Sequence, residues 1–196
     1  DLFSAVEPVK EALRALIILP SSLIFNWYDE AKRFAPHLKC TQYVGTAEER
    51  KRKVRRLTNY DLVFTSYPIV ERDSKDLQLL DFRYIILDES QRIKNKNSKT
   101  FKAINGLKAL HRVALSGTPI ENSLSDLWAQ MQFINPDILK SYASFHKNYE
   151  IEISKKKNMQ ALEELKTIIS PFLLRRTKEE VLDDLPEMES QIAYCE

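Results

Sequence analysis

The fold is decided by one stretch, Tyr84-Ile85-Ile86-Leu87-Asp88-Glu89-Ser90-Gln91-Arg92-Ile93-Lys94-Asn95. Its first four residues are apolar and rich in β-branched side chains, which predicts a short strand buried in a parallel sheet. The run stops at two adjacent carboxylates, Asp88 and Glu89. Open α/β sheets place their chemistry beyond the carboxyl ends of such strands. One carboxylate could hold Mg²⁺ and the other could activate a water molecule. An acidic helix N-terminus, which the helix dipole favours, is the structural alternative.

Strand and helix patterns alternate on both sides of this stretch. Strands are predicted at residues 15–19, 39–44, 61–65, 84–87 and 112–116, with helical patterns between them. Such alternation predicts an α/β fold of three layers, with a parallel sheet and helices on both of its faces. Three of the strands end in polar residues: Pro20-Ser21-Ser22, Asp88-Glu89 and Ser116-Gly117-Thr118-Pro119.

Several helices have recognisable starts and faces. Ser21 or Ser22 could cap a helix that ends near Pro36, Thr46 and Glu49 form a capping box, and Ser98 is a further cap. The basic run at residues 50–56 is interpreted as a solvated helix face, with phosphate contact as the alternative. Trp27 and Trp128 fit the apolar faces of their helices and are assigned no ligand.

The character of the sequence changes after Pro136. Residues 1–136 form the first predicted unit, in which a partial helix at residues 1–14 precedes the strand-helix alternation. Residues 137–190 are predicted to form a helical extension, with a second capping box at 177–180. Residues 191–196 are interpreted as the opening of a further strand.

Composition places the chain among globular domains. Its 196 residues are 43% hydrophobic and 30% charged. The formal net charge of +2 does not by itself indicate a nucleic-acid-binding protein, so any basic surface must be local. Cys40 and Cys195 lack metal-ligand spacing and are interpreted as reduced thiols in a cytosolic protein. No apolar stretch reaches membrane-spanning length, and the start lacks a signal-peptide pattern.

The polar segments resemble, in order, the motifs of the SWI/SNF-type ATPases, relatives of superfamily-two helicases that translocate on double-stranded DNA. Leu19-Pro20-Ser21-Ser22-Leu23 with Asn26-Trp27 resembles motif Ia, and Thr65-Ser66-Tyr67 resembles motif Ib. Residues 87–95 resemble motif II, and Leu115-Ser116-Gly117-Thr118-Pro119 with Asn122 resembles motif III. Residues 171–178 resemble the segment that leads out of the first lobe. The match covers nearly the whole chain and implies a partial first RecA-like lobe, a P-loop NTPase fold, with a helical appendage.

The resemblance implies a role for each motif residue. Asp88 would help to hold Mg²⁺, directly or through water, Glu89 would activate the hydrolytic water, and Gln91 would sense the γ-phosphate of ATP. Ser116, Gly117, Thr118 and Pro119 would couple nucleotide state to lobe movement, with a plain tight turn as the alternative. Contacts to DNA phosphates are implied for Pro20, Ser21, Ser22, Thr65, Ser66, Tyr67, Arg92, Lys94 and Asn95, with helix capping or a solvated strand exit as the alternatives.

The sequence departs from the family pattern in two ways. Ser90 and Gln91 stand where alanine and histidine are usual, and glutamine cannot titrate. No glycine precedes Gly45, so the phosphate loop of the family, with its Gly-Lys-Thr, does not occur among these 196 residues. We therefore expect these residues alone to hydrolyse no ATP, although the complete protein would be a DNA-dependent ATPase with a second lobe.

Two other functions stay open at this point. A degenerate lobe could bind DNA or a protein without turnover, and an unrelated Mg²⁺ hydrolase could use Asp88 and Glu89. The hydrolase would need a further carboxylate at the same sheet edge, whereas Asp61 and Asp81 are predicted at strand beginnings. The resemblance implies double-stranded DNA, and RNA polymerase or other DNA-bound proteins, as partners and no membrane. It implies a cytoplasmic, nucleoid-associated location in a bacterium or a nuclear one in a eukaryote.

Overall fold

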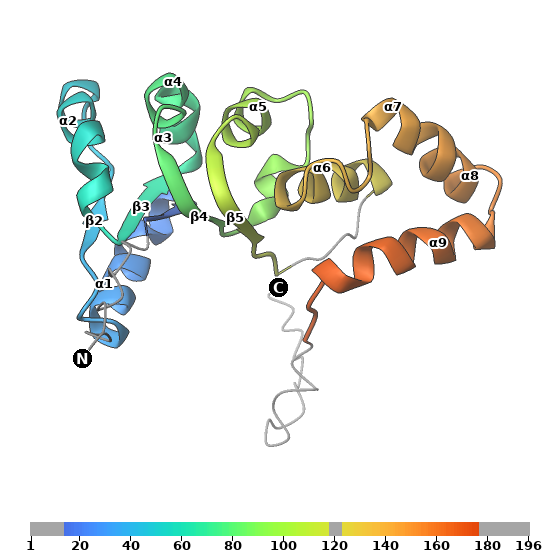
Figure 1. Ribbon diagram of the computed structural model, residues 1–196, viewed down its shortest axis with the longest axis horizontal. Coiled ribbons are helices and arrows are strands. Elements are labelled where there is room, and N and C mark those ends of the chain that lie inside the picture. The colour runs from blue at the N-terminus through green and yellow to red at the C-terminus, as the bar shows by residue number, and fades with distance from the viewer. Residues whose placement is uncertain (1–13, 118–122, 177–196) are drawn as a thin grey trace, which may run out of the picture.

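Five parallel strands form the central sheet, in the order β2-β3-β1-β4-β5 (Figure 1). The computed structural model describes residues 14–117 and 123–176. The strands are β1 (Ala15–Leu19), β2 (Cys40–Gln42), β3 (Leu62–Ser66), β4 (Asp81–Leu87) and β5 (Lys108–Ala114). Helical segments connect each strand to the next, as parallel pairing requires. The predicted parallel α/β fold is confirmed.

Helices pack on both faces of this sheet. In chain order they are α1 (Ile24–Phe34), α2 (Ala47–Lys53), α3 (Tyr67–Arg72), α4 (Ser74–Leu77), α5 (Lys99–Asn105) and α6 (Leu124–Ile134). Short 3₁₀ turns lie at η1 (Ser21–Leu23), η2 (Val54–Asn59) and η3 (Ser90–Ile93). In Figure 1, α2 to α6 line one side of the sheet and α1 lies on the other.

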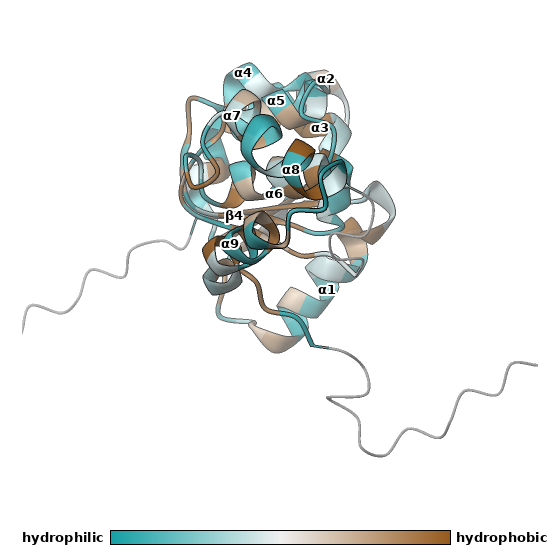
Figure 2. Cartoon of the chain, turned by 90° about the vertical axis from the view of Figure 1, so that its right-hand side faces the viewer, coloured by the Kyte–Doolittle hydropathy of each residue, from teal (hydrophilic) through white to brown (hydrophobic). Residues whose placement is uncertain are grey.

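The alternation of side chains along β1 explains the two faces. Leu16 and Ile18 belong to a large apolar cluster, which α3, α5 and α6 complete with residues such as Val70, Ile104 and Met131. Ile17 and Leu19 point the other way, into a smaller cluster that includes Ile24 of α1. All five residues of β1 are buried, and Figure 2 shows hydrophobic colour along the sheet at β4. The alternation along β1 therefore determines which helices pack on which face of the sheet.

The two edge strands differ from the sequence prediction. β2 is shorter than the predicted span of 39–44, and β5 spans Lys108–Ala114 where residues 112–116 were expected. An edge strand is paired on one side only, and β5 mixes polar with apolar side chains, so no continuous apolar run marks its start. The ladder continues one residue beyond β5, because the Leu115 amide donates to the Leu87 carbonyl at 2.7 Å.

Two of the predicted helix caps form and one does not. Thr46 and Glu49 make the reciprocal capping box of α2, and the Ser98 hydroxyl accepts from the Phe101 amide at the start of α5. Neither Ser21 nor Ser22 caps α1, because the chain first makes η1, whose leading residue is Pro20 and whose first turn has no side-chain cap. Both serines are exposed at the beginning of this segment.

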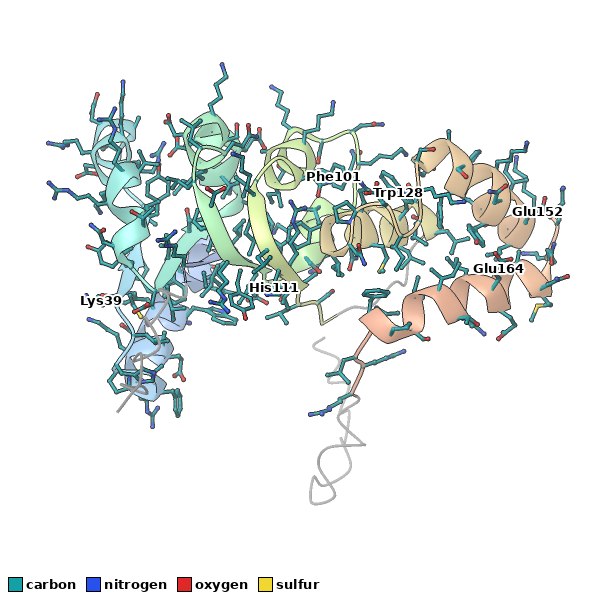
Figure 3. All side chains as sticks on the ribbon, viewed as in Figure 1. Lys39, Phe101, His111, Trp128, Glu152 and Glu164 are labelled. Carbon is teal, nitrogen blue, oxygen red and sulfur yellow. The ribbon has the colours of Figure 1, made fainter. Side chains whose placement is uncertain are left out.

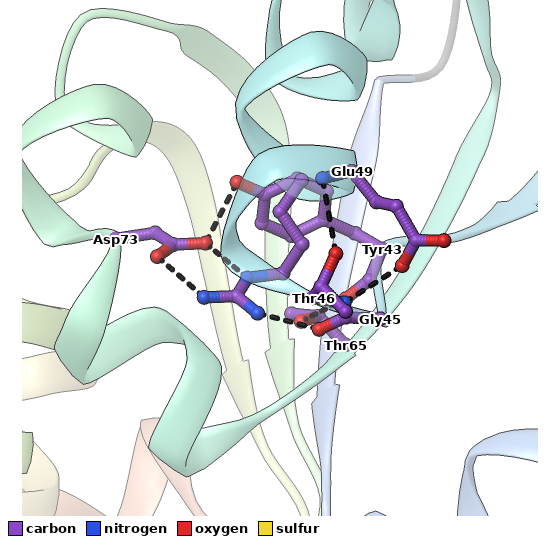
Figure 4. A network of polar contacts seen from close by, with 7 residues as sticks. Tyr43, Gly45, Thr46, Glu49, Thr65 and Asp73 are labelled. Atoms are coloured by element: carbon purple, nitrogen blue, oxygen red, sulfur yellow. Dashed lines mark hydrogen bonds and ion pairs between the residues drawn. The ribbon is translucent and has the colours of Figure 1, made fainter.

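Arg50 corrects the interpretation of the basic run as wholly solvated. This residue is 5% exposed and forms a two-pronged ion pair with Asp73, at 2.6 and 3.0 Å (Figure 4). The same guanidinium donates to the Gly45 carbonyl, and Tyr43 donates to the Asp73 carboxylate at 2.8 Å. The basic neighbours of Arg50 in α2, residues 51–53, are exposed as predicted.

A group of helices follows α6. It comprises α7 (Tyr142–Phe145), a π turn η4 (His146–Glu150), α8 (Ile151–Ser154), α9 (Met159–Ile169) and η5 (Ser170–Phe172). Trp128 anchors this group to the sheet domain, because its indole donates to the Lys140 carbonyl at 3.2 Å and its ring packs edge-on against Tyr142. Phe101 of α5 lies on its other side, with ring centroids 6.3 Å apart (Figure 3). The predicted core role of Trp128 is thus confirmed.

Some predictions fall on residues outside the described part of the chain. These are the partial helix in 1–14 apart from Arg14, the capping box at 177–180, the segment 191–196 and Cys195. The boundaries at 136 and 190 stay predictions. Within residues 14–117 and 123–176, no helix is both long and apolar enough to cross a membrane, and Cys40 forms no disulfide.

Candidate active site at the carboxyl edge of the sheet

Three polar segments that follow strands lie next to one another where the carboxyl ends of the parallel strands meet. β1 sits between β3 and β4, with Leu19 paired to Ser66 and Ile18 paired to Leu87. The Asp88 amide continues the ladder by donating to the Ile18 carbonyl at 3.0 Å. The segments 20–22, 88–89 and 115–117 therefore leave the sheet side by side, as the sequence predicted. Asp61 and Asp81 lie at the beginnings of β3 and β4, at the opposite edge.

The backbone turns sharply at Glu89. This residue has φ 52° and ψ 52°, a left-handed conformation that costs a residue with a side chain of order 1–3 kcal/mol. The turn is held on both sides, because Tyr67 donates its hydroxyl to the Asp88 carbonyl at 2.6 Å and the Ser90 amide donates to the Leu115 carbonyl at 2.9 Å. Such over-determined strain is typical of functional sites.

The Asp88 carboxylate is fixed by two donors. Its Oδ1 accepts from the Glu89 amide at 3.0 Å, and its Oδ2 accepts from the Trp27 indole Nε1–H at 3.1 Å. Sequence reasoning missed the second contact, since Trp27 also packs on the apolar cluster beneath α1 as its helical spacing predicted. An indole has an apolar body and a polar N–H, and a buried tryptophan N–H usually finds a hydrogen-bond acceptor, so the need for such a partner could have been predicted.

A chain of hydrogen bonds links Glu89 to the end of β5. The side-chain amide Nε2 of Gln91 donates to Glu89 Oε2 at 2.6 Å, and the Ser116 hydroxyl donates to Gln91 Oε1 at 3.2 Å. The Gln91 side chain therefore connects the carboxylate of Glu89 to Ser116, and a coupling role for this connection stays a prediction. Gly117 adjoins this chain and has open space around it, whereas Thr118 and Pro119 lie outside the described residues.

The donor set at Asp88 fits a hydrated Mg²⁺ ion. Each carboxylate oxygen accepts one hydrogen bond, which leaves a lone pair on each for a metal or its water. Within the described ranges, no group of three or more His, Cys, Asp or Glu side chains could form a protein cage for a metal. Mg²⁺ is usually held by one or two carboxylates together with water and substrate phosphates, so the sparse set suits it.

The residues predicted to contact DNA divide into an exposed and a buried group. Ser21, Ser22, Arg92, Lys94 and Asn95 are exposed, and Pro20 is half-buried beside them. Their phosphate contacts stay predictions.

Thr65, Ser66 and Tyr67 are buried, so the hydroxyls of Thr65 and Ser66 are not available to a phosphate in this structure, and DNA contact through backbone N–H groups of this segment stays a prediction. Thr65 donates its hydroxyl to the Tyr43 carbonyl at 2.9 Å. Burial, and secondarily the charge of Asp88, raises the pKa of Tyr67, so its hydroxyl remains a donor to the Asp88 carbonyl across the physiological range.

Comparison with known proteins identifies close relatives. Residues 5–196 match the family described as SNF2-related domain. The chain is 39% identical to the TATA-binding protein-associated factor mot1 of Aspergillus fumigatus over 97% of its own length and 11% of that protein. It is 36% identical to the chromatin-remodeling ATPase INO80 of Schizosaccharomyces pombe over 92% of its length and 12% of the relative.

A solved structure has the same fold. The Sulfolobus solfataricus SWI2/SNF2 ATPase core in complex with double-stranded DNA aligns with a TM-score of 0.80 and 44% identity. The alignment covers 90% of this chain and 37% of that one. The chain thus spans only a small part of each of these relatives.

Proposed function

This chain belongs to the family of SNF2-related domains, and from that premise we propose that it forms part of an ATP-dependent translocase on double-stranded DNA. The observation that carries the proposal is the arrangement at Glu89. Glu89 directly follows Asp88 at a strand end, and its carboxylate is connected through the Gln91 side chain to Ser116. An unrelated hydrolase would not need this connection, whereas a motor must link its hydrolytic site to a moving element.

Each group at the site has a proposed role. Asp88 holds Mg²⁺, directly or through water, with the carboxylate oxygens that Trp27 and the Glu89 amide orient. Glu89 orients and deprotonates the attacking water. Bound Mg²⁺ would neutralise charge on the ATP phosphates. Ser116 and Gln91 transmit the state of the site to the end of β5.

The proposed partners follow from the exposed residues at the same edge. Arg92, Lys94 and Asn95 follow Asp88 and Glu89 in the chain and are exposed on the surface. Ser21 and Ser22 lie at the exposed start of η1. These residues would contact the DNA backbone without reading sequence. In the complete protein, a second lobe would supply an arginine finger. The proposed cargo consists of DNA-bound proteins, RNA polymerase among them. That one solved relative is a complex with double-stranded DNA supports the choice of nucleic acid.

The proposal is tested by phosphate release from the full-length protein that carries this chain, with excess Mg²⁺-ATP and with or without linear double-stranded DNA. DNA-stimulated turnover of about one per second or more is expected, a usual motor-like rate. DNA binding without turnover would instead identify a non-catalytic module. The 196 residues alone contain no Gly-Lys-Thr or Gly-Lys-Ser and are expected to give no such turnover.

DNA binding by the 196-residue chain is expected to be weak, independent of sequence and sensitive to salt, because its net charge is only +2. Arg92→Ala and Lys94→Ala should each weaken binding several-fold and lower the salt slope by about 1, which is the signature of one lost phosphate contact. Lys108→Ala is the matched control, since Lys108 is an exposed cation at the opposite edge of the sheet. Fluorescence anisotropy at two salt concentrations measures both quantities. Equal effects of the three variants would remove the assignment of Arg92 and Lys94.

Gln91 should contribute nothing to the pH dependence of turnover, because a side-chain amide does not titrate. The wild-type protein should therefore show no histidine limb near pH 6.5 from this position. Gln91→His should introduce one, since a protonated imidazole would no longer accept a hydrogen bond from Ser116. The ratio of turnover at about pH 8 to that at about pH 6 measures the change, with the wild-type protein as the reference. Identical pH profiles would mean that the contact between Gln91 and Ser116 plays no part in turnover.

A further inference from the structure

Two aromatic side chains hold Asp88 from opposite faces of the sheet. Trp27 donates its indole N–H to the carboxylate, and Tyr67 donates its hydroxyl to the backbone carbonyl. Trp27 packs on the apolar cluster beneath α1, whereas Tyr67 belongs to the large cluster on the other face. One donor therefore restrains the side chain of Asp88, and the other restrains its backbone.

The two donors come from different surroundings: α1 begins at the proposed DNA contacts, whereas α3 begins at buried residues. Trp27 lies one turn into α1, directly after the exposed Ser21 and Ser22. Tyr67 is the first residue of α3, and it follows β3, the neighbour of β1 in the sheet. Asp88 follows β4, on the other side of β1, so the Tyr67 side chain reaches across the end of β1 to contact it.

The two contacts leave little freedom at Asp88. An indole has a single donor, and that of Trp27 is used on the carboxylate. Tyr67 is 3% exposed, so its hydroxyl has little access to bulk water as an alternative partner. Movement of α1 or α3 by a fraction of an ångström would therefore lengthen one of these bonds and change where the carboxylate points. The contact at Trp27, at 3.1 Å, lies toward the long end of the ordinary range of 2.7–3.2 Å for N–H···O hydrogen bonds.

We infer that Trp27 and Tyr67 are positioning residues at Asp88, and that DNA engagement at η1, directly before α1, sets the geometry of the carboxylate through Trp27. DNA contact at η1 would seat α1 and tighten the Trp27 bond to the carboxylate, while Tyr67 keeps the backbone turn at Glu89 in place. The inference rests on the proposed function and deepens it, because it names the path from the nucleic acid to the hydrolytic site. Neither residue touches substrate itself.

Variants of single hydrogen-bonding groups test this link in the full-length protein. Trp27→Phe removes the indole donor and keeps an aromatic ring, and Tyr67→Phe removes one oxygen atom. Each has a matched control in the same fold. Trp128→Phe removes an indole donor that serves the Lys140 carbonyl, and Tyr43→Phe removes a buried hydroxyl that serves Asp73. The measured quantity is the stimulation ratio, which is ATP turnover with saturating DNA divided by turnover without DNA.

We expect the ratio to fall about tenfold in Trp27→Phe, which loses a hydrogen bond to a carboxylate, and about fivefold in Tyr67→Phe, which loses one to a neutral backbone carbonyl. Both controls should stay within about twofold of the wild-type ratio, and the affinity for DNA should be unchanged in all four variants. Tyr67→Phe gives an independent result if Trp27→Phe fails to fold. A ratio equal to that of the matched control in either folded variant would overturn the inference, as would equal losses with and without DNA.

A readout without nucleotide or metal separates this inference from the proposed function. The 196-residue chain contains two tryptophans, so its ¹⁵N-labelled form gives two indole N–H signals. Asp88→Asn should shift the Trp27 signal, and excess short duplex DNA at low salt should shift it as well, while the Trp128 signal stays in place. A Trp27 signal that ignores both changes contradicts the link. Absence of DNA-stimulated turnover in the wild-type protein, with these shifts present, would overturn the proposed function alone.

Discussion

Replacing Glu89 by glutamine should lower DNA-stimulated ATP turnover of the full-length protein by about 10²-fold or more, within the usual range for loss of a general base. ATP binding should survive, because the substitution keeps the size of the side chain and an oxygen that can accept from Gln91. The left-handed backbone at residue 89 is held by contacts of its neighbours, so glutamine should not disturb the turn.

The control for this prediction is Glu71→Gln. Glu71 lies on α3 and accepts a hydrogen bond from the Thr100 hydroxyl at 2.6 Å, so it is a structurally engaged carboxylate outside the site. Its turnover should stay within about twofold of wild type. Steady-state phosphate release measures turnover, and titration with a fluorescent ATP analogue measures binding. Near-wild-type turnover in Glu89→Gln would remove Glu89 from the water-activating role.

The sheet and its functional edge could be predicted because they are local in the sequence. Strand β4 is a short apolar run stopped by two carboxylates, and the same pattern of apolar run and polar stop marks the end of β1. Parallel topology then brings these ends together without any further information. The helix starts at Thr46 and Ser98 were predictable for the same reason, since a cap and its partner are three residues apart.

The contacts that sequence reasoning missed are long-range. Trp27 and Asp88 are 61 residues apart, and Tyr67 and Asp88 are 21 apart. Trp27 was interpreted from its helical spacing as a core residue, and Tyr67 was assigned a DNA contact because its segment resembles motif Ib. Which polar tip meets which partner depends on how β1, β3 and β4 are ordered, and strand order is not written in any one segment.

Arg50 was misinterpreted for a related reason. It stands among five exposed basic residues, Lys51, Arg52, Lys53, Arg55 and Arg56, and periodicity alone does not distinguish it from them. Its partner Asp73 is 23 residues away, between α3 and α4. Only the turn of α2 onto the sheet, which follows Gly45 at φ 108°, aims Arg50 inward. This buried pair leads to the second large prediction.

Arg50→Met should destabilise the protein by about 3–5 kcal/mol, the usual cost of removing one partner from a buried ion pair. The substitution keeps the aliphatic stem but leaves the Asp73 carboxylate, 14% exposed, with Tyr43 as its remaining side-chain donor among the described residues. Arg52→Met is the matched control, because Arg52 lies on the same helix, is exposed and forms no ion pair within the described residues. It should change stability by less than about 0.5 kcal/mol. Urea unfolding measures both variants, and Arg50→Met should lower the midpoint by more than about 1 M.

The dependence on pH gives this prediction its sharpest form. Burial by itself would raise the pKa of Asp73, but hydrogen bonds from Arg50 and Tyr43 and the charge of Arg50 outweigh burial, and the pKa lies below its ordinary value. A carboxyl whose pKa is lower in the folded than in the unfolded state stabilises the fold above the unfolded pKa of about 3.9, and that contribution is lost as the pH falls through the folded value. The deficit of Arg50→Met should therefore be full near neutral pH and should shrink as the pH falls through the Asp73 pKa of the variant, which lies higher than in the wild type because burial is no longer offset by Arg50. A deficit that is unchanged at about pH 3, or that is matched by Arg52→Met at neutral pH, would mean that the pair of Arg50 and Asp73 does not hold α2 to the sheet.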